Sequence, residues 1–150
     1  MKIDWQKLVG VEKPEESKGF MLWQTSQLWQ REVNKILQPF ELTMQQLLIL
    51  AGIAWLTRED DLIATQVDIA RFLEIDSMVV SQILKRLEKK NLVERDVHPH
   101  DTRAKIVRLT NAGTETFTEA LPQVHLLEEA FFSNNDQLLT ILQNIYGHYK

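Results

Sequence analysis

DSMVVSQILKRLEKKNLVERDVHPHDTRAKIVRLT, residues 76–110, is the stretch of this chain that decides its fold. Its first half predicts one short amphipathic helix, because apolar residues recur at spacings of three and four: Val79, Val80, Ile83, Leu84 and Leu87. Asp76 or Ser77 can cap the start of this helix, and Asn91 can adopt the left-handed conformation that ends it. The face opposite the apolar residues carries small, polar or basic side chains and no acid: Ser77, Met78, Ser81, Gln82, Lys85 and Arg86.

After this helix the period changes from 3.6 to 2, which predicts a hairpin of two strands. The first strand contains Leu92, Val93, Arg95 and Val97, the turn is HPHDTRA at 98–104, and the returning strand contains Ile106, Val107 and Leu109. Upstream, Thr65 and Asp68 have the spacing of a helix cap and open a brief helix, QVDIARFLEI, in which five residues are expected to face inward: Val67, Ile69, Ala70, Phe72 and Leu73. The turn at 74–76 joins the two helices tightly. Two such helices followed by a hairpin with a basic tip are typical of a winged helix-turn-helix, which binds DNA.

The order of these pieces resembles the MarR family of bacterial transcriptional regulators. The resemblance is carried by LEKKNLVER at 87–95, DTR at 101–103 and VRLTNAG at 107–113, and LTMQQ at 42–46 is similar to the start of the family's second helix. It extends over residues 20–148. It implies one domain, 1–150, that is mainly α-helical with a small β wing. In that domain a winged helix-turn-helix core at about 42–110 is flanked by N- and C-terminal dimerisation helices at about 17–38 and 110–149.

Three segments outside the core predict helices with wide apolar faces, at 20–38, 112–131 and 134–149. The first begins near Ser17 and is ended by Pro39, whereas Thr110 and Ser133 are expected to cap the other two. Pro122 is expected to kink the second. A capping box of Thr43 and Gln46 opens a further helix that ends near an acidic turn at 58–61. Exposed apolar stripes are a liability on a small monomer, so we infer packing against a second copy, and the resemblance also implies a homodimer.

We expect the DNA-binding residues on the second helix of the motif and on the wing. The early helix reaches base edges in a major groove and carries Ser77, Met78, Val79, Ser81 and Gln82. Many family members have Thr near Val79 and Arg near Gln82, so the departure here concerns which bases are preferred. Lys85 and Arg86 are expected to contact phosphates, whereas Lys89 and Lys90 either do the same or are solvated. Arg86 and Lys89 can alternatively form helix-surface pairs with Glu88 or Glu94.

The wing residues take their roles from the resemblance. Arg103 lies at the wing tip, where a guanidinium can enter a narrow minor groove. Asp101 is expected to hold that arginine in position, and Arg95 to pair with the wing Asp or with phosphate. The alternative role for Arg103 is a surface ion pair that stabilises the hairpin.

The charge distribution favours this interface more than the net charge of −4 does. Residues 62–110 hold nine Lys/Arg and seven Asp/Glu, a balance of +2, whereas the remainder holds eight and fourteen, a balance of −6. The alternative function is a winged-helix module that binds a protein partner through its acidic body. Steep salt dependence of duplex binding would separate the two, because phosphate contacts release counterions.

Several classes of protein are disfavoured. Without cysteine the chain has no disulfide framework and no thiol switch, and no run approaches the roughly 20 apolar residues of a membrane span. The N-terminus lacks a signal-peptide apolar block, so a soluble cytoplasmic protein is the simplest interpretation. No nucleophile with its base, phosphate-binding glycine loop or metal-ligand cluster is evident, so we expect neither an enzyme nor a cofactor.

Two groups of residues have weaker interpretations. His98 and His100 form a His-Pro-His turn, which favours mildly basic side chains near phosphate over a zinc site. The resemblance also implies a small aromatic ligand between the dimerisation helices and the winged-helix lobe. Aromatic residues at helical spacing are more often core or interface, so no ligand residue is assigned among those on the corresponding segments: Trp23, Trp29, Trp55, Phe117 and His125.

Overall fold

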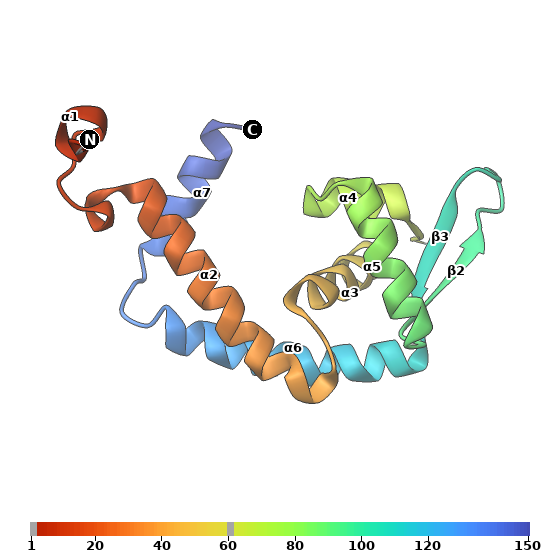
Figure 1. Cartoon of the computed structure of the whole chain (residues 1–150). Helices are drawn as coiled ribbons and strands as arrows, with labels where there is room; N and C mark the ends of the chain where they lie inside the picture. Colours follow the sequence, from red (N-terminus) through yellow and green to blue (C-terminus); the bar gives the residue numbers. More distant parts are fainter. Residues whose placement is uncertain (1–2, 60–61) are drawn as a thin grey trace.

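The computed structural model in Figure 1 describes residues 3–59 and 62–150 of the chain. Residues 60–61 of the predicted acidic turn lie outside these ranges. The elements are α1 (Trp5–Val9), α2 (Lys18–Leu37), α3 (Met44–Leu56), β1 (Ala64–Thr65), α4 (Gln66–Leu73), α5 (Ser77–Lys89), β2 (Val93–Val97), β3 (Lys105–Leu109), α6 (Asn111–Phe131) and α7 (Leu138–His148), with 3-10 turns at Pro14–Glu16 and Gln38–Phe40. The mainly helical fold with a small antiparallel sheet confirms the predicted fold class.

The winged-helix lobe, which we define as α3 to β3, has a continuous apolar core. Its most deeply buried side chains come from α3, α4, α5 and the sheet: Ile49, Leu50, Ile53, Ile69, Val80, Leu84, Leu87, Val93 and Val107. The three strands are antiparallel in the order β1-β3-β2, with Ala64 opposite Val107 and Arg95 opposite Val107 on the other side. Strand β1 is only two residues long, and Leu62 and Ile63 before it are exposed.

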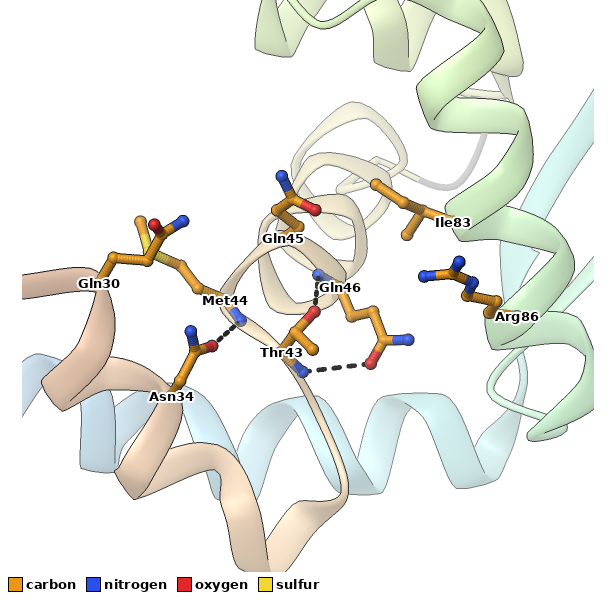
Figure 2. Close-up of a pocket in the computed structure, with 8 residues that line it drawn as sticks. All are labelled: Gln30, Asn34, Thr43, Met44, Gln45, Gln46, Ile83 and Arg86. Atoms are coloured by element: carbon orange, nitrogen blue, oxygen red, sulfur yellow. Dashed lines mark hydrogen bonds between the residues drawn. The ribbon is translucent and has the colours of Figure 1, made fainter. Parts of the chain in front are cut away.

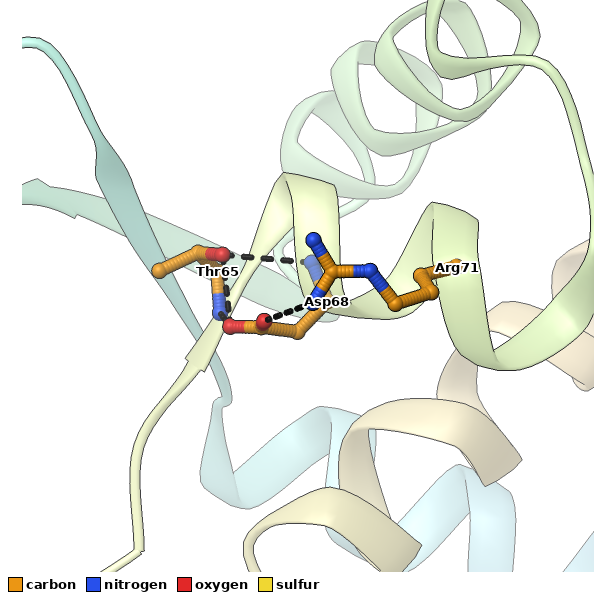
Figure 3. Close-up of polar contacts among 3 residues, drawn as sticks. All are labelled: Thr65, Asp68 and Arg71. Atoms are coloured by element: carbon orange, nitrogen blue, oxygen red, sulfur yellow. Dashed lines mark hydrogen bonds and ion pairs between the residues drawn. The ribbon is translucent and has the colours of Figure 1, made fainter.

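Local capping sets where the helices of the lobe begin. Thr43 and Gln46 form the predicted capping box of α3, and Thr65 and Asp68 form that of α4 (Figure 3). Asp68 also approaches the Arg71 guanidinium, at 4.0 Å from Oδ1 to Nη1. Each box satisfies two backbone groups that a helix start otherwise leaves unpaired. These boxes fix the starts of α3 and α4, the two helices against which α5 packs.

Three residues predicted to face inward lie at the edge of the lobe. Val67 is 53% exposed, Phe72 47% and Val79 39%. In α4 the buried residues are only Ile69 and Ala70, because this short helix covers the core with one narrow stripe. At about 100° per residue, Val79 lies roughly 90° from the centre of the buried stripe of α5. The inward assignment of these three residues is therefore wrong.

The terminal helices bury much less surface than the lobe. Helix α6 leaves the lobe along the base of the molecule and packs against α2, where Val33, Leu37, Ala120 and Val124 are buried (Figure 1). Neither α1 nor α7 contains a buried residue. Among the described residues no single helix is long and apolar enough to span a membrane, although the bent pair Trp5–Phe40 with Met44–Leu56 meets that test together.

The start of α7 differs from the prediction. Ser133 does not cap it; the helix begins at Leu138, with Gln137 as an N-cap that makes no side-chain hydrogen bond. Turns precede it, and Asn134 adopts a left-handed conformation with φ of 63°. A helix cannot pass through a residue in that conformation, so the apparent capping pair at 133–136 lies in a turn.

Candidate nucleic-acid interface

The surface of α5 opposite its buried stripe is a row of exposed side chains without an acid. The buried stripe consists of Val80, Ile83, Leu84 and Leu87. Residues separated by three or four positions share a face, so the opposite row consists of Met78, Gln82, Lys85 and Lys89, all of them exposed. We call these four residues the outer row. Ser77 and Ser81 flank it on one side, and Val79 and Arg86 flank it on the other.

The start of α5 is fixed by two contacts. The Asp76 carboxylate accepts hydrogen bonds from the backbone N–H groups of Met78 at 2.8 Å and Val79 at 3.4 Å. The Gln66 carboxamide, from the first turn of α4, donates to the Ser77 carbonyl at 3.3 Å and approaches its hydroxyl at 3.5 Å. Sequence analysis missed Gln66, because its role depends on how α4 crosses α5.

The basic residues of α5 divide into two groups. Lys85 and Lys89 belong to the outer row, whereas Arg86 points toward α2 and α3 and lines a cavity there (Figure 2). Lys90 donates to the Glu41 carbonyl and lies 3.4 Å from Gln46 Oε1, so it is neither free nor merely solvated. Lys89, rather than Arg86, therefore shares the direction of Lys85.

Arg95 is held by α5 instead of by the wing tip. Its guanidinium donates to Glu88 Oε2 from Nη2 at 2.5 Å and from Nε at 3.2 Å, and its side chain is only 11% exposed. Arg95 was expected to pair with the wing Asp or with phosphate, and the structure pairs it with Glu88 instead. Glu88 is also one of the two alternative partners, Glu88 and Glu94, that were considered for Arg86 and Lys89. The hydrogen bond from Arg95 lowers the pKa of Glu88, with a further contribution from the opposite charge. The pair joins the end of α5, which we call the recognition helix, to β2.

Backbone hydrogen bonds shape the tip of the wing. The Asp101 carboxylate accepts from the backbone N–H of Arg103 at 3.0 Å, so it holds the arginine through its main chain and not through its guanidinium. His98 Nδ1 accepts from the N–H groups of His100 and Asp101, each at 3.1 Å. The Arg103 side chain is exposed. Across residues 3–59 and 62–150, no three His, Cys, Asp or Glu side chains lie close enough to bind a metal ion.

A compact junction joins the recognition helix, the wing and α6. Asn91 takes the predicted left-handed conformation, with φ of 57°, and ends α5. The Thr110 hydroxyl donates to the Asn91 carbonyl at 2.7 Å and accepts from the Gly113 N–H at 2.9 Å. A Cβ on Gly113 would lie 1.9 Å from the Leu92 carbonyl oxygen, so only glycine fits there. VRLTNAG is therefore a structural junction as well as a motif.

The five residues considered for an aromatic ligand occupy different environments. Trp23 and His125 are exposed, whereas Phe117 is partly buried against the core. The Trp29 ring lies 6.2 Å from that of Phe132, and the Arg58 guanidinium lies 4.5 Å from the Trp55 ring. None of the five lines the cavity next to Arg86.

Comparison with known proteins gives the same fold and a family. The MarR family model matches residues 42–105. The HTH-type transcriptional regulator YdcH of Bacillus subtilis (strain 168) is 37% identical over 138 residues, which is 90% of this chain and 93% of the relative.

Solved structures agree in fold. A mutant of MarR from E. coli complexed with operator DNA has a TM-score of 0.79 at 22% identity, covering 99% of this chain and 100% of that chain. CouR from Rhodococcus jostii RHA1 bound to p-coumaroyl-CoA has a TM-score of 0.73 at 21% identity, covering 90% and 95%. Through its fold and its 37% identity to a relative of nearly equal extent, this chain belongs to the MarR family of winged-helix transcriptional regulators.

Proposed function

We propose that this chain acts as a homodimeric, sequence-specific repressor that binds a pseudo-palindromic operator. The observation that carries the proposal is the acid-free outer row of α5, presented next to a wing whose Arg103 side chain is exposed. An exposed helix face with lysines suits a major groove flanked by phosphates. The structures of relatives bound to DNA support the same use of the fold.

Each residue of the interface has a proposed role. Ser77, Met78, Val79, Ser81 and Gln82 lie along the base edges, where a Gln carboxamide can pair with adenine and a Met side chain can touch a thymine methyl group. Lys85 and Lys89 bind phosphates, and Arg86 approaches the backbone only from the flank of the helix. Arg103 enters the minor groove. Arg95 and Asp101 position the wing through Glu88 and the Arg103 backbone.

The proposed dimer is supported by the terminal helices. Helix α7 has no buried residue, yet it presents Leu139, Ile141, Leu142, Ile145 and Tyr146. Exposed apolar side chains also lie on α1 and α2: Trp5, Leu8, Val9, Met21, Leu22, Trp23 and Leu28. A surface of this extent is typical of an interface between copies. Two recognition helices then enter successive major grooves about 10 bp apart. Relief of repression by a small aromatic ligand stays a prediction.

Selection of random duplexes at physiological salt, with the dimer verified in solution, tests the proposal. We expect the wild-type protein to enrich a palindrome. Arg103→Ala should weaken operator affinity about tenfold and reduce the slope of log affinity against log salt concentration by about one, because one positive charge that releases counterions is removed. Arg31→Ala removes the same side chain from α2, outside the lobe, and should bind like the wild type. Absence of any enriched sequence would favour the protein-interaction module. Unchanged operator affinity in Arg103→Ala would contradict the role proposed for Arg103 in the wing.

A further inference from the structure

The tip of the wing, residues 98–104, carries Arg103 at the end of the hairpin. Strands β2 and β3 project beyond the helices of the lobe (Figure 1), so the tip is shaped by hydrogen bonds inside the turn. The His98 N–H donates to the Ala104 carbonyl at 3.1 Å, and the Ala104 N–H donates to the Asp101 carbonyl at 3.0 Å. The residues between His98 and Ala104 therefore form a closed loop, and its conformation sets the position of Arg103.

The His98 imidazole fixes the first half of this loop. Its Nδ1 atom accepts from the backbone N–H groups of His100 and Asp101, each at 3.1 Å. A ring nitrogen that accepts from two N–H groups carries no hydrogen of its own, so the ring is neutral with its hydrogen on Nε2. Asn and Asp side chains cap turns in the same way, through a bond to the N–H two residues later. His98 does this with a group that can be protonated near neutral pH.

The second half of the loop depends on the first. The Asp101 carboxylate accepts from the backbone N–H of Arg103 at 3.0 Å, while the Asp101 N–H donates to the His98 ring. One residue thus links the imidazole to the arginine. A change in the His98 ring is passed to the main chain of Arg103 through two consecutive hydrogen bonds.

We propose that His98 is a positioning residue of the wing, whose neutral ring holds Arg103 in the geometry that enters the minor groove. This role rests on the function proposed above for Arg103. Protonation places a hydrogen on Nδ1, which then faces two N–H groups and no longer accepts from them. The cap is present while the ring is neutral and is lost as the pH falls through the range in which histidine side chains titrate. Discrimination between the operator and other duplexes should therefore decrease in acid.

Other charged groups of the hairpin act in the same direction. His98 follows β2 directly and β3 is paired alongside, so the groups beside it belong to the distal half of this hairpin: Asp96, His100, Asp101, Arg103, Lys105 and Arg108. Asp96 is already paired with Arg108, at 3.5 Å from Oδ2 to Nη1. Asp101 is the remaining carboxylate of this set, and its attraction to an imidazolium would compete with its bond to the Arg103 N–H. Protonation of His98 thus weakens both halves of the loop.

A positive charge on the wing has a second, opposite effect on DNA binding. An imidazolium near phosphates releases about one more counterion, which strengthens binding to every duplex. The ratio of operator affinity to affinity for an unrelated duplex separates the two effects, because both duplexes share the phosphate contribution. We therefore expect His98 to act on this selectivity ratio more than on the affinity itself.

NMR of the full-length protein tests the cap without DNA, over the pH range in which histidine titrates. The ring nitrogen signals of His98 report its tautomer and its protonation. At about pH 8 we expect the tautomer with hydrogen on Nε2, and backbone amides of His100 and Asp101 that are protected from exchange with water. On acidification the amide signals of Asp101 and Arg103 should shift together with protonation of the His98 ring.

Three variants separate the acceptor from its titration. His98→Asn places an amide oxygen close to the position of Nδ1 and cannot be protonated, so it should keep the cap at every pH. His98→Gln carries the same amide one methylene further from the backbone and should lose the cap. His100→Asn is the matched control, because it removes the neighbouring imidazole, whose centroid lies 6.1 Å from that of His98, and leaves the cap in place.

The selectivity ratio is measured with the enriched duplex and an unrelated one at constant ionic strength. Between about pH 8 and about pH 5.5 it should fall about fivefold in the wild type and in His100→Asn, as expected for the loss of about one net hydrogen bond. In His98→Asn it should change less than about twofold. In His98→Gln it should be low at both values of pH.

Two results would overturn the role of His98. One is a set of Asp101 and Arg103 amide signals that do not follow protonation of the ring. The other is a selectivity ratio that falls equally in His98→Asn and the wild type, or that rises in acid in the wild type alone, which would make the ring a phosphate contact. If no duplex is enriched, the function proposed above fails, and the NMR titration alone decides whether His98 caps the turn.

Discussion

The winged-helix lobe and the terminal helices are similarly apolar in sequence but differ in what a single chain can bury. In the lobe, Ile53 and Leu84 are fully buried, whereas Ile145 in α7 is 55% exposed. Capping does not follow this division, because the terminal helices α1, α2 and α6 have side-chain caps as α3, α4 and α5 do, whereas α7 has none. The lobe builds its core from α3, α4, α5 and the sheet, whereas α7 has no buried residue, and a second copy is the partner proposed above for its apolar face.

The largest expected effect comes from truncating one apolar side chain in each region. Leu84→Ala should lower the free energy of unfolding by about 2–5 kcal/mol, because it leaves a cavity in the lobe core. Ile145→Ala should instead weaken the dimer, because its side chain is exposed in one copy. Urea unfolding at several protein concentrations checks both. A concentration-independent loss of several kcal/mol in Ile145→Ala would contradict the contrast.

Adding one methyl group to a glycine should separate the regions almost as clearly. Gly113→Ala should cost about 3 kcal/mol, because the new Cβ would meet the Leu92 backbone oxygen, which cannot rotate away. Gly147→Ala, in α7, meets nothing within 4 Å and should stabilise the helix by up to about 1 kcal/mol. Thermal unfolding midpoints measure both changes. Destabilisation of similar size in the two variants would show that Gly147 is in close contact with another part of the protein.

Helix caps should give a smaller contrast in the same direction. Thr110→Ala removes an N-cap whose hydroxyl also bonds Asn91, and should cost about 1–2 kcal/mol. Asp4→Ala removes the cap of the five-residue α1, and should leave global unfolding unchanged because α1 buries nothing. Chemical denaturation resolves the difference. A measurable loss in Asp4→Ala at all protein concentrations would mean that α1 belongs to the cooperative unit.

The smallest effect should be a pH-dependent one at the pair Glu88–Arg95. The Arg95 hydrogen bond lowers the Glu88 pKa in the folded state, so the pair stabilises the protein above the ordinary Glu value of 4.5 and its contribution is lost as the pH falls through the folded-state pKa. The stability difference between wild type and Glu88→Gln should therefore shrink on acidification from pH 7 to 3.

Glu74→Gln is the matched control, at a pair between the lobe and Lys150 at the end of the chain. Its carboxylate pairs with Lys150, whose hydrogen bond also lowers the Glu74 pKa, but the Lys150 side chain is 58% exposed. Salt should screen this pair more than Glu88–Arg95, whose arginine is nearly buried. Urea titrations at low and high salt compare the two. Equal salt sensitivity would show that burial of Arg95 makes no difference.

Structural features that depend on a few neighbouring residues, such as helix caps, could be predicted from the sequence. Thr43 with Gln46, Thr65 with Asp68 and the cap at Thr110 each depend on one turn of chain, and so does the left-handed Asn91. The periodicity of α5 likewise predicted its buried stripe. At 133–136, however, the same kind of signal failed, because a left-handed Asn134 competes with the helix start.

Contacts that depend on how elements cross could not be predicted. Nothing in the spacing of Glu88 and Arg95 shows that β2 returns along α5, so the arginine was assigned to the wing Asp or to phosphate. The orientation of Arg86 depends on α2 and α3, which converge on its flank. Arg86 was predicted to contact phosphate beside Lys85, whereas the structure places its side chain in the lining of a cavity that α2 and α3 also line.

The junction at Thr110 also has a mechanical consequence. The Thr110 hydroxyl joins the residue after α5 to the first turn of α6 by two hydrogen bonds, and the Gly113 backbone packs directly against the Leu92 carbonyl. These contacts leave little room for α5 and α6 to move relative to one another. The recognition helix, the wing and the start of α6 therefore form a single stiff lever. In a dimer, a change in the distance between the two α5 helices would therefore require bending at a point after Gly113, in α6 or in the other terminal helices. Each α5 helix and its wing would then move as one rigid body, with their geometry toward DNA unchanged.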